Sequence, residues 1–148
     1  MEMKRGGISF MDNQFRKFLD IYLEAWRSSS LNRMRDLISK DYKAREIKDG
    51  DIIDFGFEES IIGWEQGFLF AKENNAEWEL NKVSIIPLRT DEIMVIISAT
   101  MTLKGKSTNS AHLFFQTFRK ESFGKWKIIR SHIEAGISLD NLRNIQFT

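Results

Sequence analysis

The residues best suited to chemistry in this sequence lie in its last third: His112, Arg130, His132 and Glu134. A histidine exchanges a proton near neutral pH, and a neighbouring carboxylate can orient its ring. Such a cluster can transfer protons, and it can equally form polar pairs at an interface between subunits. Two histidines and one carboxylate are a weak ligand set for a metal ion, so we predict no metal.

Whether these four side chains meet depends on the register of a hairpin between two predicted strands, 110–120 and 125–135. The intervening Ser122-Phe123-Gly124 suits a three-residue loop with Gly124 in the left-handed conformation. This loop would pair Lys120 with Trp126, Phe118 with Ile128, Gln116 with Arg130, Phe114 with His132, and His112 with Glu134. Because side chains alternate along a strand, these residues would share one face, whereas a two-residue loop would break the last pair.

Both faces of this hairpin carry apolar side chains, which a solvent-facing surface would not need. We therefore expect helices to cover one face, and a subunit partner or a pocket to cover the other. The pattern leaves open which face points inward. The residues assigned to the opposite face are mostly ordinary core: Ala111, Leu113, Phe115, Thr117, Ile129, Ser131 and Ile133.

The elements that must position these residues can be read from periodicity. Apolar residues at helical spacing predict helices over 12–27, 31–38 and 58–73, with Ser29 or Ser30 capping the second. Alternating or β-branched runs predict strands over 41–47, 77–87 and 92–103, with a turn at 48–51. The sequence thus predicts an α+β fold in which three helices pack on a strongly curved antiparallel sheet, a cone-shaped, cystatin-like roll.

Length and composition indicate one domain, over 12–136, between a flexible N-terminal tail (1–11) and a C-terminal tail (137–148). The 22 basic residues are scattered and balanced by 21 acidic ones, so we expect no nucleic-acid partner. No apolar run is long enough to span a membrane, and the first ten residues do not resemble a signal peptide. The sequence has no cysteine, which fits a reducing compartment, and we expect a cytoplasmic location.

The order of elements, together with the closing segment Gly124-Lys125-Trp126-Lys127-Ile128-Ile129-Arg130-Ser131-His132, resembles the nuclear transport factor 2-like superfamily. The resemblance covers residues 12 to about 136. It implies a pocket between the sheet and the helices, and usually a dimer. Members of this superfamily include isomerases, dehydratases, polyketide cyclases, transport adaptors and oligomerisation hubs, so the fold alone does not determine the function.

Within that group, Tyr22-Leu23-Glu24-Ala25 followed by Leu31 is similar to the start of the ketosteroid isomerases. The resemblance places Tyr22 on their oxyanion-hole tyrosine and Glu46 on their general-base aspartate. The sequence departs from them in carrying Glu at that position and in having no match for their second, protonated acid. A structural role is the alternative for both residues: a core position for Tyr22 and a surface carboxylate for Glu46.

These observations predict a small-molecule-binding domain of the polyketide cyclase or isomerase type, with an apolar ligand and proton transfer without a cofactor. The predicted catalytic residues are Tyr22, Glu46 and His132. The predicted ligand-binding residues are Trp26, Trp64, Phe68, His112, Phe114, Gln116, Arg130 and Glu134. The alternative function is a non-enzymatic interaction module. In either case we expect a homodimer formed through the sheet.

Overall fold

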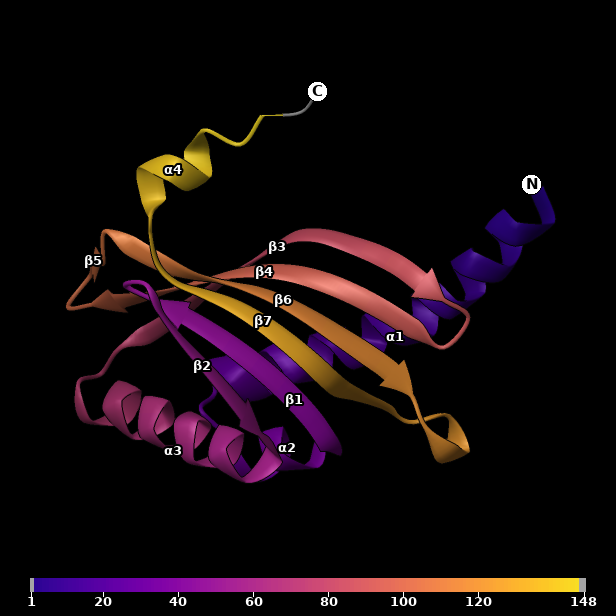
Figure 1. Cartoon of the computed structure of the whole chain (residues 1–148), viewed down its shortest axis with the longest axis horizontal. Coiled ribbons are helices and arrows are strands. Elements are labelled where there is room, and N and C mark those ends of the chain that lie inside the picture. The colour runs from indigo at the N-terminus through magenta and orange to yellow at the C-terminus, as the bar shows by residue number, and fades with distance from the viewer. Residues whose placement is uncertain (1, 147–148) are drawn as a thin grey trace.

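A computed structural model gives the fold, and it describes residues 2–146, with side chains over 13–146. The chain is α+β, as predicted, with two long helices and two short ones (Figure 1). In chain order the elements are α1 (Glu2–Arg27), α2 (Leu31–Asp36), β1 (Ile38–Lys48), β2 (Asp51–Gly56), α3 (Phe57–Glu73), β3 (Glu77–Arg89), β4 (Glu92–Leu103), β5 (Lys106–Ser107), β6 (Ser110–Lys120), the 3₁₀ turn η1 (Ser122–Gly124), β7 (Trp126–Ser138) and α4 (Leu139–Arg143).

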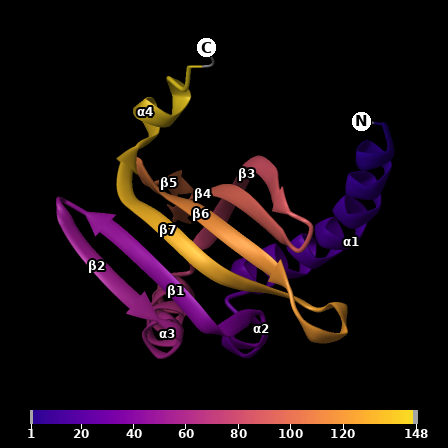
Figure 2. The same cartoon turned by 45° about the vertical axis from the view of Figure 1, so that its right-hand side comes forward.

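The strands form one sheet in the order β2-β1-β7-β6-β4-β3, with β5 paired to β4. The prediction of a wholly antiparallel sheet is wrong, because β1 pairs with β7 in parallel. A parallel pair needs a long connection, which the intervening chain supplies here. The sheet twists but is not strongly curled, so the prediction of a cone-shaped roll overstated its curvature (Figures 1 and 2).

Strand β2 is an element that the sequence analysis missed. It pairs antiparallel with β1 from Lys43 opposite Gly56 to Lys48 opposite Asp51. Asp49 and Gly50 therefore form a two-residue turn, and both have positive φ, of 50° and 85°. An Asp-Gly pair is well suited to this turn, which matches the right-handed twist of the two strands. Asp51 and Asp54 interrupt the apolar run of this short segment, which hid its pairing from the sequence analysis.

The core lies between the sheet and one stripe of α1. Phe15, Leu19, Tyr22 and Trp26 recur at helical spacing and are at most 1% exposed. Aromatic and β-branched side chains of β4 and β6, among them Phe118, pack against this stripe. The predicted tails at 1–11 and 137–148 contain regular structure, since α1 begins at Glu2 and α4 follows β7. Their flexibility stays a prediction.

Helices α1, α2 and α3 lie on one side of the sheet, and no described helix covers the other side (Figures 1 and 2). Ser30 caps α2, because its hydroxyl accepts a hydrogen bond from the Arg33 backbone N–H at 3.4 Å. The carboxylate of Glu59 accepts from the Gly56 N–H at 3.1 Å at the start of α3. No helix among the described residues is long and apolar enough to cross a membrane.

Candidate functional site

An interior pocket of about 430 Å³ lies between α1, α3 and the sheet. This volume falls within the range of small-molecule sites. Rings from six elements line it: Trp26, Tyr42, Phe55, Trp64, Trp78 and Phe114. Trp26 is at their centre, with edge-to-face contacts at 4.9 Å to both Trp64 and Phe114. Its indole N–H is buried without an acceptor, so this ring offers apolar surface and not a donor to the pocket.

Two glycines of α3, Gly63 and Gly67, also line the pocket. Residues four apart lie on one helix face, so these two leave the side of α3 that faces the pocket without side chains. A Cβ at Gly63 would meet nothing within 4 Å, and one at Gly67 would reach only the Trp78 ring, at 4.0 Å. Each glycine costs about 1 kcal/mol in helix propensity relative to alanine. A side chain at either position would not clash with the backbone, so the packing of α3 does not require glycine. The absence of a side chain at both positions leaves space in the pocket.

A buried chain of hydrogen bonds forms the polar part of the pocket floor. The hydroxyl of Tyr22 donates to Oε1 of Gln116 at 2.8 Å, and Nε2 of Gln116 donates to Oγ of Ser131 at 3.4 Å. The hydroxyl of Tyr42 lies near Ser131, whose side chain acts on the pKa of this tyrosine. Gln116 and Tyr42 line the pocket, whereas Tyr22 is fully buried behind them. Tyr22 therefore contacts the pocket only through Gln116.

The electrostatics of this chain keep both tyrosines neutral. Burial, opposed by the hydrogen bond with Ser131 and assisted by the charge of Glu46, raises the pKa of Tyr42 to about 12. Burial also raises the pKa of Tyr22 well above its usual value, with a smaller contribution from Tyr42. The interaction with Tyr42 also shows that Glu46, half-buried on β1, lies close to the polar floor.

His112 contributes a second polar group, at the exposed edge of the pocket. Its Nδ1 accepts a hydrogen bond from the backbone N–H of Gly136 at 3.2 Å. One ring nitrogen of His112 is therefore engaged by the backbone, and the imidazole is held at the edge of the pocket.

The predicted register of the last hairpin is correct near its loop and wrong beyond it. Gly124 has φ of 73°, and the pairs Lys120 with Trp126 and Phe118 with Ile128 are confirmed. Thr117 then pairs with Arg130, so Ile129 is an extra residue in β7, a β-bulge. The bulge moves every later side chain of β7 to the opposite face.

This bulge corrects the prediction that His112, Arg130, His132 and Glu134 share one face. It also places Leu113, and not His112, opposite Glu134. His112 stays on the pocket side, because it lines the pocket with Phe114 and Gln116. The other three side chains lie on the outer face, where alternation after Ile129 directs them.

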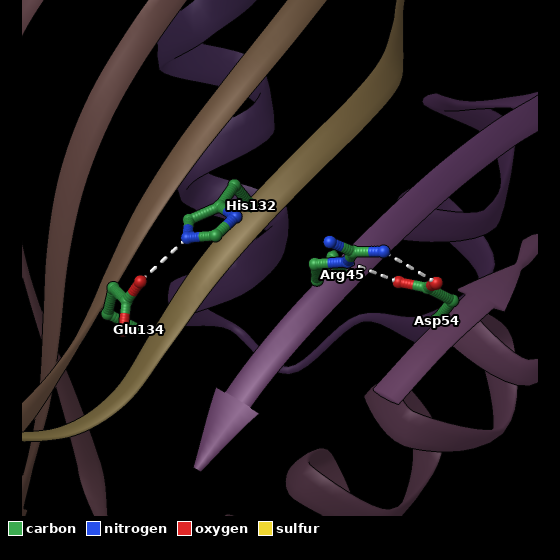
Figure 3. A network of polar contacts seen from close by, with 4 residues as sticks. All are labelled: Arg45, Asp54, His132 and Glu134. Carbon is green, nitrogen blue, oxygen red and sulfur yellow. Dashed lines mark hydrogen bonds and ion pairs between the residues drawn. The ribbon is translucent and has the colours of Figure 1, made fainter. Parts of the chain in front are cut away.

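On the outer face the charged side chains form separate pairs (Figure 3). Nε2 of His132 lies 2.7 Å from Oε2 of Glu134, two residues along β7. Arg45 of β1 donates to both carboxylate oxygens of Asp54 on β2, at 2.7 and 2.9 Å. His132, Arg45 and Asp54 border a hollow of about 1080 Å³ that is larger than the interior pocket. This hollow is open to solvent, so it is a surface depression and not an enclosed site.

Arg130, also on this face, donates to Glu92 of β4 at 2.9 Å. Phe68 is buried, with its ring 5.5 Å from that of Trp64, and it does not line the interior pocket. The predicted residues that do line it are Trp26, Glu46, Trp64, His112, Phe114 and Gln116. Over residues 13–146 no group of three or more histidine or acidic side chains is placed to hold a metal ion.

Several pocket residues escaped the sequence analysis, among them Tyr42, Phe55 and Trp78. The Gly-x-x-x-Gly spacing of Gly63 and Gly67 is a signal that could have located the pocket on α3. The bulge also left a trace in the sequence. Two consecutive isoleucines, at 128 and 129, break the alternation of β7, and every second residue from Ser131 onward is then small or apolar.

Comparison with solved structures shows that the chain has a nuclear transport factor 2-like, cystatin-like fold. A nuclear transport factor 2-like protein of unknown function from Pseudomonas putida superposes with a TM-score of 0.68 at 12% identity, covering 90% of this chain and 92% of that one. A domain of unknown function with a cystatin-like fold from Nostoc punctiforme gives 0.66 at 15% identity, covering 89% and 81%. A third similar protein of unknown function, from Shewanella oneidensis, gives 0.64 at 17%, covering 83% and 98%.

Sequence comparison adds nothing to this fold assignment. No protein-family model matches the chain. No curated protein matches it either.

Proposed function

We propose that this nuclear transport factor 2-like domain binds a small molecule in its interior pocket. The observation that carries the proposal is a cavity of about 430 Å³ walled by six aromatic rings. Its larger polar groups are Glu46 with the Tyr42–Gln116 floor and His112 at the edge, and hydroxyl side chains also line it: Ser60, Thr100, Thr108 and Ser110. Apolar walls with a few placed polar groups are the usual composition of a ligand site.

The reaction that this site would support is proton transfer without a cofactor, as in isomerases and polyketide cyclases. Of the three predicted catalytic residues, only Glu46 lines the pocket. We therefore propose Glu46 as the group that exchanges a proton with the ligand. Tyr22 would act by fixing Gln116, and His132 lies on the other face of the sheet.

The test of binding is to fill the pocket from α3. Gly63→Leu would project an isobutyl group into space where a Cβ meets nothing within 4 Å. We expect the variant to bind naphthylmethanol, a neutral two-ring probe, at least roughly tenfold more weakly in isothermal titration calorimetry. Its free energy of unfolding should rise by about 0.5–1 kcal/mol, because leucine is a better helix former than glycine.

The matched control is Gln66→Leu, which introduces the same side chain on an exposed position of α3 outside the pocket lining. Its affinity for the probe should equal that of the unchanged protein. Equal binding by both variants, or no binding of the probe to the unchanged protein, would contradict a ligand site in this pocket.

We also propose that the chain forms a homodimer through the outer face of the sheet. On β4 and β6, Ile96 lies opposite Phe115, and both are partly exposed there. Two arginines near this apolar pair form ion pairs within the chain, Arg130 with Glu92 and Arg45 with Asp54, which reduces the charge that a second copy would meet. A cytoplasmic location stays a prediction, supported by the cysteine-free sequence.

Sedimentation equilibrium tests the dimer. Phe115→Lys should give a monomer, because a lysine at the centre of the interface would be desolvated without a partner. Ile21→Lys changes a residue of α1 that is 56% exposed on the opposite side, and it should leave a dimer unchanged. A monomeric unchanged protein would refute the proposal.

A further inference from the structure

Among residues 13–146, whose side chains are described, one acidic residue lines the interior pocket, and no lysine or arginine does. The acidic residue is Glu46. Nδ1 of His112, at the edge of the pocket, already accepts a hydrogen bond from the Gly136 N–H. A ligand with a carboxylate or phosphate would therefore meet repulsion from Glu46 and no cation to compensate its lost hydration.

The aromatic walls of the pocket, like Glu46, favour a positively charged ligand. Each aromatic ring has a negative face and a positive edge, so a cation over a ring face is attracted to it. Tryptophan is the strongest partner for such a contact, and three of the four tryptophans of the chain line this pocket. Trp26, Trp64 and Trp78 come from α1, α3 and β3, and Trp26 contacts the other two rings at 4.9 and 6.1 Å.

Other polar side chains of the pocket form hydrogen bonds with partners other than the carboxylate of Glu46. Gln116 already accepts from Tyr22 and donates to Ser131, and the hydroxyl of Ser60 donates to the Phe57 carbonyl at 2.8 Å. Arg45, the neighbour of Glu46 on β1, points to the outer face and pairs with Asp54. The carboxylate of Glu46 therefore faces the aromatic pocket as the one acidic group of its described lining.

We propose that the ligand of this pocket is a small organic cation: an ammonium group beside Glu46, attached to an apolar ring body that lies against Trp26, Trp64 and Trp78. This inference rests on the proposed function, since it names the ligand class of the same site. It adds the sign of the charge, which the size and apolar character of the pocket do not determine.

Three probes of one shape test the sign of the charge: naphthylmethylammonium, naphthylmethanol and naphthoate, which are cationic, neutral and anionic. Calorimetric titration of the full chain at neutral pH and low salt should rank them in that order. We expect the cation to bind roughly tenfold tighter than the alcohol, which corresponds to a cation–aromatic contact plus a partly exposed ion pair. Added salt should reduce this difference.

Glu46→Gln keeps the size of the side chain and removes its charge. It should weaken binding of the ammonium probe about tenfold and leave that of the alcohol within about twofold. The control Glu65→Gln makes the same change of net charge on an exposed residue of α3 outside the pocket lining, and it should change neither affinity.

The outcomes separate the two proposals. Equal affinity for the ammonium and the alcohol, or an equal loss of both in Glu46→Gln, would overturn the cationic ligand and leave the binding pocket standing. Failure of all three probes to bind the unchanged protein would overturn the binding function itself, and the ligand class with it.

Discussion

Phe118→Ala should lower the free energy of unfolding by about 3–5 kcal/mol, the cost of removing a fully buried phenylalanine and leaving a cavity. Phe118 is 0% exposed and joins the sheet to the aromatic stripe of α1. Its ring centre lies 5.5 Å from those of Phe15 and Phe18 and 5.2 Å from that of Tyr22. Three aromatic contacts of this kind cannot re-form around an alanine, so relaxation would recover little of the lost stability.

The chain supplies a control for this variant five residues further on. Phe123, at the tip of the β6–β7 loop, is 99% exposed. Phe123→Ala removes the same atoms and should change the stability by no more than about 0.5 kcal/mol. Urea denaturation of both variants, followed by tryptophan fluorescence, checks the pair. Similar losses for the two would show that the helix α1 does not pack on the sheet as described.

High pH should destabilise the protein through its two tyrosines, both of which are buried. The pKa of Tyr42 is raised to about 12 in the folded state, so the neutral form is favoured by folding. This contribution is fully present below the unfolded pKa of about 10, and it is lost as the pH rises through about 12. Two pKa units correspond to roughly 3 kcal/mol, and Tyr22, whose pKa is also raised, acts in the same direction.

Comparison with Tyr42→Phe isolates this effect, because the lysines titrate alike in both proteins. Urea denaturation at a series of pH values between about 9 and 12 should show a steeper loss for the unchanged protein than for the variant. Tyrosinate absorbance should also develop together with unfolding and not before it. Parallel pH profiles would show that Tyr42 is not held neutral by the fold.

The predicted site residues lie on two faces of the sheet, and only one of these faces borders the interior pocket. The histidine–carboxylate pair that looked most catalytic in the sequence, His132 with Glu134, lies on the outer face, where His132 borders an open hollow. Glu46 has no unusual neighbour in the sequence, yet it is the one acidic residue in the described lining of the interior pocket. Experiments on ligands should therefore begin with Glu46, and those on assembly should begin with Phe115.

The sequence by itself determined most of the long elements and the buried stripe of α1. Phe15, Leu19, Tyr22 and Trp26 are spaced so that they share one side of a helix, and that side is buried. The β-branched run 92–103 matches β4 at both ends. Local chemistry also determined the loop at Ser122–Gly124 and the Ser30 cap. These features depend on residues close together in the chain, where periodicity and backbone preference act directly.

Only the tertiary structure decided which strand faces point into the pocket and which distant strands pair. A single extra residue at Ile129 reverses the direction of every later side chain in β7, because strand side chains alternate with a period of two. It moved His132 out of the pocket and brought Ser131 to Gln116. The parallel pairing of β1 with β7, which places Glu46 opposite Ile133, is likewise a contact between distant segments. No local pattern specifies such contacts, since they form through packing of the whole sheet against the helices.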